Sequence, residues 1–298
     1  MSGALTFGLD LGGTKCLGVA CRDGEVLAQY RAATDTDGPG EVIDLLVDVT
    51  NQLRATAGDP GAIGVGAPGL VTSEGTLARA PNLPGVHDLA LRRRLADAVG
   101  VEVVVENDAA AAAWAEFSKG AAAAARSMLA VTLGTGVGGG IVLDGQLVRG
   151  AHGFAAEIGH VIVREGGRPC VCGKRGCFEA YASGSALGRL ARERLGLSGE
   201  QVTAAAVRGD AAALVVLGEY AGEVALGLGS LIEILDPEMV VISGGLVEVG
   251  DVLLGPVRSA LPEFVYSWPH RPPTPLVAAQ LGERAGAIGA ALLAAERA

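Results

Sequence analysis

The first half of the chain alternates short apolar runs with longer stretches of helical spacing. Three apolar runs separated by turn residues, Ala4–Asp10, Cys16–Cys21 and Glu25–Tyr30, predict a three-strand meander. Apolar residues three and four apart then predict a helix over Glu41–Ala57. The remaining elements of this half are predicted in the same way: a strand at Ala62–Gly66, a helix at Asp88–Val99 capped by Asp88, a strand at Val101–Val105 and an alanine-rich helix over Ala109–Ala125.

The second half repeats this order of elements. Met128–Leu133, Gly140–Leu143 and Gln146–Val148 form a second predicted meander. The pattern then predicts helices at Ser185–Leu195, Ala211–Leu235 and Val247–Leu261, strands at Met239–Ser243 and Leu276–Gln280, and a helix from Arg284 to the end. Two copies of a meander followed by strand–helix units predict an α/β protein with two lobes. We expect residues 1–109 to form the smaller lobe, joined by the C-terminal helix 285–298, and residues 110–284 to form the larger lobe.

Composition and charge narrow the classes of protein. With 298 residues, 50% of them hydrophobic, the chain has room for two modest domains and a sizeable core. Acidic residues outnumber basic ones by 33 to 23, and the net charge of −10 argues against non-specific binding of nucleic acid or an anionic membrane. The N-terminus lacks a basic stretch followed by an apolar segment, and no apolar run reaches about 18 residues, so we expect a cytoplasmic protein.

A cluster of cysteines beside a histidine predicts a metal site. Cys170, Cys172 and Cys177 fall within eight residues, and His160 lies ten residues before the first of them. Three thiolates and one imidazole are a complete tetrahedral ligand set for zinc, and a site with four protein ligands is structural rather than catalytic. The alternative is free thiols or a disulfide, although a disulfide would leave an odd cysteine in a protein expected to be cytosolic.

Two glycine-rich loops occupy the same place in the two meanders. The first comprises Asp10, Leu11, Gly12, Gly13, Thr14 and Lys15, and the second runs from Leu133 to Gly140 and includes Thr135 and Gly136. Glycines let backbone N–H groups approach a phosphate, and an aspartate at a strand end suits Mg²⁺ held through water. The second loop matches G-x-G-x-x-G, but a strand follows it, which excludes the dinucleotide fingerprint. Facing each other, the loops would hold a polyphosphate from both sides; the alternative is two ordinary hairpin turns.

Two further positions combine a candidate role with an ordinary one. Gly244-Gly245 ends a strand and opens a helix, which suits contact with an adenosine or a plain helix start. Asn107-Asp108 lies at the carboxyl end of a strand, where α/β folds place ligands. Asp108 is a candidate general base for a hydroxyl nucleophile, and it is equally a candidate helix cap. Both readings stay open on the local sequence.

Taken in order, these segments resemble the ROK family (repressors, open reading frames and kinases), and within it the bacterial ATP-dependent glucokinases. The resemblance covers essentially the whole chain. Its most specific segment runs from Cys170 to Gly184 and reads C-x-C-G-x-x-G-C-x-E-x-x-x-S-G. The other segments that carry it are Asp10-Leu11-Gly12-Gly13-Thr14-Lys15, Gly66-Ala67-Pro68-Gly69, Glu106-Asn107-Asp108, Leu133-Gly134-Thr135-Gly136 and Glu157-Ile158-Gly159-His160.

The resemblance implies a fold, a reaction and a set of site residues. The fold is the two-lobed actin-like (sugar kinase/Hsp70) ATPase fold, here with a zinc-binding insertion, and the reaction is transfer of the ATP γ-phosphate to the 6-hydroxyl of D-glucose with Asp108 as general base. The sugar would be bound by Gly69, Asn82, Asn107, Asp108, Glu157, His160 and Glu179. ATP and Mg²⁺ would be held by Asp10, Gly12, Gly13, Thr14, Lys15, Thr135, Gly136, Gly244 and Gly245. Structural Zn²⁺ would be held by His160, Cys170, Cys172 and Cys177.

Two departures from the family pattern affect the sugar side. Ala156 replaces a glycine that the family often has before Glu157. No aromatic residue follows Pro81-Asn82-Leu83, where many glucokinases have one, so the wall beside Asn82 differs in shape.

Other functions remain alternatives within the resemblance. Kinases of N-acetylmannosamine, N-acetylglucosamine or mannose share these motifs, and polyphosphate is an alternative phosphate donor. A sugar-sensing repressor would need a DNA-binding domain ahead of the first strand, which starts within about five residues of Met1. We therefore expect D-glucose and ATP as partners, no nucleic acid and no membrane, and a homo-oligomer, either a dimer or a tetramer.

Overall fold

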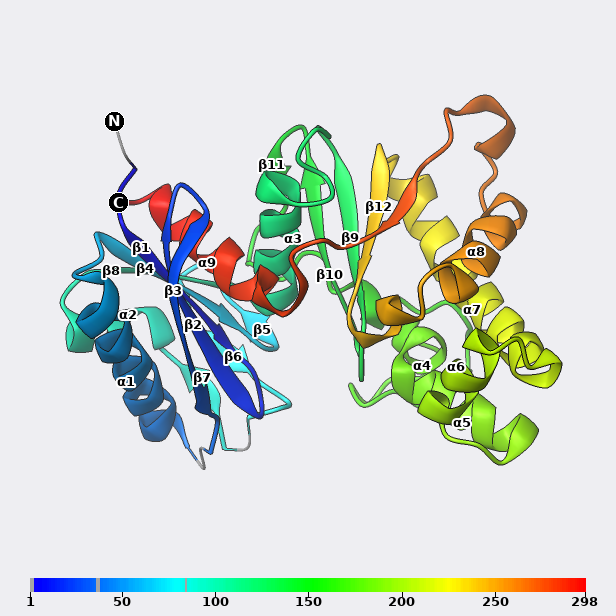
Figure 1. Cartoon of the computed structure of the whole chain (residues 1–298), viewed down its shortest axis with the longest axis horizontal. Helices are drawn as coiled ribbons and strands as arrows, with labels where there is room; N and C mark the ends of the chain where they lie inside the picture. The colour runs from blue at the N-terminus through cyan, green and yellow to red at the C-terminus, as the bar shows by residue number, and fades with distance from the viewer. Residues whose placement is uncertain (1–2, 36–37, 84) are drawn as a thin grey trace.

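Two five-stranded sheets form the framework of the protein, with two helices packed between them (Figure 1). The computed structural model describes residues 3–35, 38–83 and 85–298, so Met1 and Ser2 of the predicted leaderless N-terminus lie outside the described residues. Each sheet has two antiparallel pairs followed by two parallel pairs, and the strand orders are β3-β2-β1-β4-β8 and β11-β10-β9-β12-β13. The prediction of two repeated α/β cycles is therefore confirmed. The lobe boundaries at residues 109 and 284 stay a prediction.

The first sheet contains β1 (Thr6–Leu11), β2 (Lys15–Arg22), β3 (Glu25–Ala33), β4 (Ala62–Ala67) and β8 (Glu102–Asn107). Strand side chains alternate between faces, and Phe7, Leu9, Ile63 and Val65 lie on the face that forms a buried core with α1 (Pro39–Ala57) and α2 (Leu91–Val99). The opposite face carries glycines at Gly8 and Gly64 and is covered by α9 (Ala285–Ala295).

The second sheet contains β9 (Met128–Leu133), β10 (Val137–Leu143), β11 (Gln146–Leu147), β12 (Met239–Ser243) and β13 (Leu276–Ala278). A large buried core joins one face to α5 (Gly184–Leu195), α6 (Gly199–Val207), α7 (Ala211–Leu235) and α8 (Asp251–Ala260). Among the described residues, α7 alone is long and apolar enough to cross a membrane, but half of its apolar window is buried inside the protein. It packs as a core helix of the second sheet.

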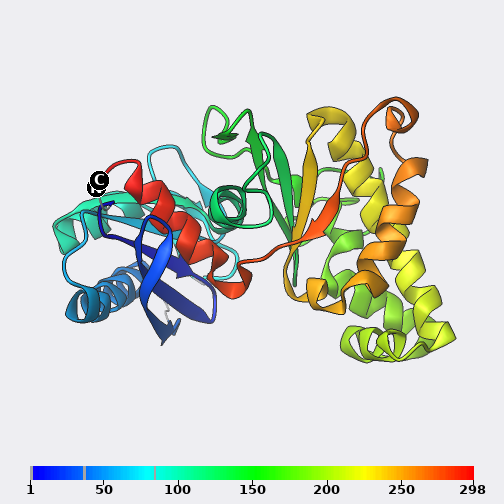
Figure 2. The same ribbon diagram turned by 45° about the horizontal axis from the view of Figure 1, so that its top comes forward.

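Helices α3 (Asp108–Lys119) and α9 lie side by side between the two sheets (Figures 1 and 2). The backbone of α9 also comes very close to the backbone of the first sheet. A Cβ atom on Gly8 of β1 would lie 1.9 Å from the Ala287 carbonyl oxygen of α9. Likewise, a Cβ atom on Gly64 would lie 1.9 Å from the Ala290 carbonyl oxygen, and one on Gly289 would lie 1.7 Å from the Ala111 carbonyl oxygen. Glycine is thus required at each of these contacts.

A buried glutamate fixes the end of α3. Glu116 is 2% exposed, and its Oε2 accepts a hydrogen bond from the Ala121 amide at 2.9 Å. Its Oε1 accepts hydrogen bonds from the Gln280 and Leu281 amides at 2.9 and 2.8 Å. These amides belong to the segment that leads from β13 back to α9, so one carboxylate ties together the two chain crossings between the sheets.

The structure corrects several predicted elements. The alanine-rich helix ends at Lys119 rather than at Ala125, where Gly120 and the Glu116 carboxylate turn the chain. Asp88 does not cap a helix: it lies in β7 (His87–Leu89) with φ of 49°, and α2 begins at Leu91 without a side-chain cap. That strand joins β5 (Leu70–Val71) and β6 (Leu77–Arg79) in a small third sheet that was not predicted. Helix α6 was not predicted either.

The remaining elements are short. They are α4 (Glu179–Ala182) and the 3-10 helices η1 (Ile158–His160), η2 (Gly245–Val249), η3 (Leu261–Glu263), η4 (Trp268–His270) and η5 (Gly282–Arg284).

The helix–sheet contact generates a stability prediction. Gly64→Ala should lower the free energy of unfolding by about 1–3 kcal/mol, because the new methyl group meets the backbone of Ala290 and no flexible side chain gives way. Gly218→Ala, at an exposed position of α7 with open space around it, should instead raise stability by about 0.5–1 kcal/mol. Denaturant unfolding of both variants checks the pair. Equal stability of the two variants would contradict the close approach of α9.

Candidate active site and metal centre

Two aspartates meet at the carboxyl ends of three neighbouring strands. Asp10 lies in β1, and Asp108 follows β8, with β4 between the two strands. A Cβ atom on Gly66 of β4 would lie 3.5 Å from the Asp108 Cα and 3.8 Å from an Asp10 carboxylate oxygen. The carboxyl ends of parallel strands are where α/β folds place ligands. The absence of a side chain at Gly66 therefore leaves space between the two aspartates, which lie close enough for the charge of Asp108 to raise the pKa of Asp10.

The helix cap at this edge is Asn107, not Asp108. The Asn107 side-chain oxygen accepts a hydrogen bond from the Ala110 amide at 3.0 Å, which caps α3. Its Nδ2 donates to the Gly69 carbonyl oxygen at 3.0 Å, so the same amide also fixes the loop after β4. Asp108 is the first helical residue and accepts from the Ala109 amide at 2.8 Å. The capping role that competed for Asp108 is thus filled by its neighbour.

Burial perturbs both aspartates. Removal from water raises the pKa of Asp108 from its ordinary 3.8 to about 6, although hydrogen bonds from the Ala109 and Asp108 amides oppose the shift. Burial also raises the pKa of Asp10 to about 7; the charge of Asp108 raises it further, and that of Lys15 lowers it. Both pKa values lie close to neutral pH. Such groups exchange protons readily under physiological conditions.

Glu157 and His160 lie close to Asp108, although they come from the insertion after β11. Burial raises the pKa of Glu157, His160 lowers it, and the charges of Asp108 and Glu179 raise it, so these three groups all lie within electrostatic reach of Glu157. Ala156, just before Glu157, has φ of 67°. This is the left-handed conformation that favours glycine, so the alanine that departs from the family pattern occupies a position where glycine would be unstrained.

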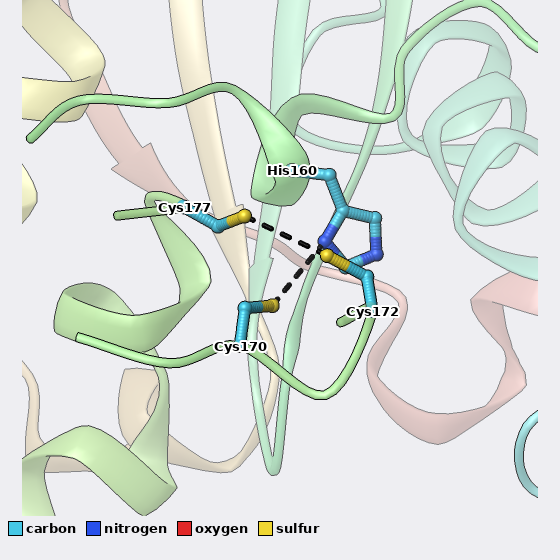
Figure 3. Close-up of side chains that lie close together, drawn as sticks. All are labelled: His160, Cys170, Cys172 and Cys177. Carbon is cyan, nitrogen blue, oxygen red and sulfur yellow. Dashed lines mark hydrogen bonds between the residues drawn. The ribbon is translucent and has the colours of Figure 1, made fainter. Parts of the chain in front are cut away.

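The His160, Cys170, Cys172 and Cys177 side chains converge as the sequence predicts (Figure 3). Their ligand atoms lie within 4.8 Å of one another. The Cys172 and Cys177 sulfurs are 3.7 Å apart, as are the Cys170 sulfur and the His160 Nδ1. Tetrahedral zinc with Zn–S bonds of about 2.3 Å separates two ligand sulfurs by about 3.8 Å. The cluster therefore fits a structural zinc ion.

Glu179 connects this cluster to the second glycine loop. Its Oε1 lies 3.5 Å from the Cys170 sulfur, and its Oε2 accepts a hydrogen bond from the Val137 amide at 3.0 Å. A Cβ atom on Gly136 would lie 2.4 Å from the same Oε2, so the glycine makes room for the carboxylate. The metal ligands, Glu179 and the turn between β9 and β10 thus form one continuous set of contacts.

The second glycine loop borders a large cavity. The Gly184 amide donates to the Gly134 carbonyl oxygen at 2.7 Å, and the Ser185 hydroxyl donates to the Thr135 carbonyl oxygen at 2.9 Å. Gly245 begins η2 on another side of the cavity. The cavity measures about 1160 Å³ and is lined mainly by the second glycine loop, α5, α6 and η2. It is large enough for a nucleoside and shares Gly134 and Thr135 with the loop.

The first glycine loop lies on the other side of the site. Its turn is closed by a hydrogen bond from the Gly12 amide to the Lys15 carbonyl oxygen at 2.9 Å. Asn82 approaches this loop closely, because a Cβ atom on Gly13 would lie 2.7 Å from the Asn82 carbonyl oxygen. The Lys15 ammonium group does not stand free, since it donates to Glu283 at 2.8 Å. The exposed Thr14 side chain lies at the tip of the same turn.

Sequence reasoning missed several residues that shape the site. Glu106 is 7% exposed; its Oε2 accepts from the Arg149 Nε at 2.6 Å and its Oε1 from the Asn107 amide at 3.1 Å. This ion pair joins the strand that leads to Asp108 to the insertion that carries Glu157. Nothing in the sequence pairs residues 43 positions apart. The α6 wall of the cavity did have a signal, because Ser198 and Gln201 form a capping box at its start.

Comparison with known proteins agrees with this geometry. A family model described as the ROK family matches residues 6–297. A glucokinase from Streptomyces coelicolor is 36% identical over 313 residues, covering 98% of each chain, and an N-acetylmannosamine kinase from Citrobacter koseri is 34% identical, covering 97% of this chain and 98% of the other. The crystal structure of a ROK family glucokinase from Streptomyces griseus in complex with glucose and AMPPNP is 35% identical, with a TM-score of 0.86, and the match covers 98% of this chain and 99% of the other.

The cysteine cluster generates a prediction about metal content. Protein prepared without chelator should contain one zinc ion per chain, and Cys172→Ser should lower both the zinc content and the free energy of unfolding, the latter by roughly 2–5 kcal/mol. Cys21→Ala is the matched control, because Cys21 is a buried thiol in β2, away from the cluster, and its loss should leave the zinc content unchanged. Elemental analysis and thermal melts check both variants. Wild-type protein without zinc would contradict the assignment.

Proposed function

Because this chain belongs to the ROK family, we propose that it is an ATP-dependent glucokinase. It transfers the ATP γ-phosphate to the 6-hydroxyl of D-glucose and releases glucose 6-phosphate and ADP. The observation that carries the proposal is the position of Asp108. This partly buried carboxyl group has a raised pKa, does not cap the helix, and lies close enough to Asp10 and to Glu157 to raise the pKa of each.

Asp108 acts as the general base in this proposal. A carboxylate with a pKa of about 6 accepts a proton from a hydroxyl group as that oxygen attacks phosphorus. Phosphoryl transfer depends mainly on positioning and on neutralising charge, so the neighbouring groups orient the acceptor. We assign the sugar hydroxyls to polar groups around Asp108, namely Gly69, Asn82, Asn107, Glu157, His160 and Glu179. His160 suits this role because its Nδ1 faces the cysteine cluster and leaves Nε2 for a hydroxyl.

The donor phosphates are assigned to the two glycine loops. Gly12, Gly13 and Thr14 with Lys15 approach them from the first sheet, and Thr135 with Gly136 from the second. The adenosine occupies the adjoining cavity, which Gly245 lines and next to which Gly244 ends the loop after β12. Asp10 suits Mg²⁺, since its carboxylate lies at a strand end next to Asp108 and loses its proton near neutral pH.

A panel of sugars tests the substrate. Purified protein with Mg-ATP should phosphorylate D-glucose faster than mannose, N-acetylglucosamine or N-acetylmannosamine, measured as ADP formation at matched sugar concentrations. Identities of 34% to an N-acetylmannosamine kinase and to an N-acetyl-D-glucosamine kinase make these two sugars the main competitors. The same assay with inorganic polyphosphate in place of ATP tests the donor. Preference for another sugar would overturn the glucose assignment, and absence of turnover with every sugar would overturn the kinase assignment.

Asp108→Asn tests the proposed base. Turnover should fall by about 10²- to 10⁴-fold, because asparagine keeps the hydrogen bond from the Ala109 amide but accepts no proton. In the wild-type protein, kcat should fall as the pH drops below about 6–7, where Asp108 and Asp10 become protonated.

The melting temperature of Asp108→Asn shows whether a loss of turnover comes from the missing base or from unfolding. Because the folded-state pKa of Asp108 is raised, its contribution to stability is present below about pH 4 and is lost as the pH rises through about 6. Asp108→Asn should therefore melt at or above the wild-type temperature at pH 7.5, and this advantage should vanish near pH 4. Near-normal kcat in the variant would exclude Asp108 as the base.

A further inference from the structure

Glu283 bridges two cations beside the first glycine loop. Its Oε2 accepts from the Lys15 Nζ at 2.8 Å, and its Oε1 accepts from the Arg31 Nη2 at 2.5 Å. Lys15 opens β2 at the end of the glycine loop, Arg31 lies in β3, and Glu283 lies in η5 just before α9. The two cations and one carboxylate carry a net charge of +1. Without the Glu283 carboxylate, Lys15 and Arg31 together would carry a charge of +2 beside the first glycine loop.

The backbone holds Glu283 in this position. The Glu116 carboxylate binds the Gln280 and Leu281 amides, two to three residues before Glu283. The start of α9 is also fixed, because a Cβ atom on Gly286 would lie 2.8 Å from the Asp10 carboxyl carbon. The segment between these two contacts is short, so the backbone of Glu283 is fixed beside the first glycine loop.

We propose that Glu283 is a positioning residue that competes with the donor phosphate for Lys15. An anion that enters the first glycine loop has to displace Glu283 from Lys15 or share the ammonium group with it. The negative charge of Glu283 also repels the incoming phosphate groups. Glu283 therefore weakens phosphate binding and favours phosphate release. This inference rests on the proposed function, in which the first glycine loop holds phosphate groups.

The side chains concerned are half-exposed, which sets the size of the effect. The exposed fractions are 46% for Lys15, 48% for Arg31 and 57% for Glu283. Interactions between charges at such positions are modest and are screened by salt. We therefore expect Glu283→Gln to tighten phosphate binding by about three- to fivefold at low ionic strength, and the gain to disappear near 0.5 M salt.

Calorimetric titration with inorganic tripolyphosphate tests the proposal without sugar or turnover. The matched control is Glu102→Gln, because Glu102 has a similar exposed fraction of 51% and pairs with Arg92 in an ion pair outside the site. Glu283→Gln should bind tripolyphosphate more tightly than wild type, while Glu102→Gln should match wild type. A charge effect of this kind depends on salt, whereas a merely structural effect of the substitution would not.

A double-mutant cycle assigns the effect to Lys15. Lys15→Met should weaken binding, and Glu283→Gln should produce little gain in the Lys15→Met background. Unchanged or weaker tripolyphosphate binding by Glu283→Gln would overturn the proposal, as would an equal gain in both backgrounds. The sugar panel is independent of this result: tighter binding by Glu283→Gln with no turnover on any sugar would reject the kinase while the competition at Lys15 stands.

Discussion

The positions of the two aspartates depend on the close contact of one helix with the first sheet, which two glycines of the sheet allow. Helix α9 contacts β1 and β4 through Gly8 and Gly64, and it contacts α3 through Gly289. The buried Thr6 hydroxyl adds a hydrogen bond to the Ala291 carbonyl oxygen at 3.0 Å. Because α9 contacts the first sheet and α3 through backbone atoms, no flexible side chain can change these two distances. The same approach brings the start of α9 to Asp10 and sets α3, and with it Asp108, over the second sheet.

The insertion after β11 is held in place in a different way. Between β11 and α4 the chain contains only one short 3-10 helix, so this stretch has little regular hydrogen bonding to hold it. Ile158 and Phe178 anchor its two ends in the large core, and a zinc ion held by the four ligand side chains would cross-link the part between them. Glu179 extends this rigidity to the turn between β9 and β10 through the Val137 amide. A single cross-link thereby supports residues that we assign to both the sugar and the phosphates.

The sequence predicted what repeats locally and missed what depends on distant partners. Strand periodicity located both meanders, and the spacing of His160 and the cysteines identified the metal site, because both signals lie within short segments. Asp88 was misread as a cap because an aspartate before an apolar helix usually is one; here its neighbours pair with β6. Gly8 in β1 and Gly64 and Gly66 in β4 were a usable sign of close packing. Glu116 gave no sign, since a lone glutamate in an alanine-rich helix is expected to face water.

Glu116 also has a mechanical consequence. The chain passes between the two sheets twice, through α3 and through the segment between β13 and α9, and the two passages are clamped together at a single carboxylate. Two struts fixed far apart would make a brace that resists rotation about any axis. The contact of Gly289 with Ala111 attaches α9 to α3 at a second place, so the two passages are held to each other at more than one point. Glu283 lies two residues beyond the clamped Leu281 amide, so the carboxylate that pairs with Lys15 is held by the same attachment.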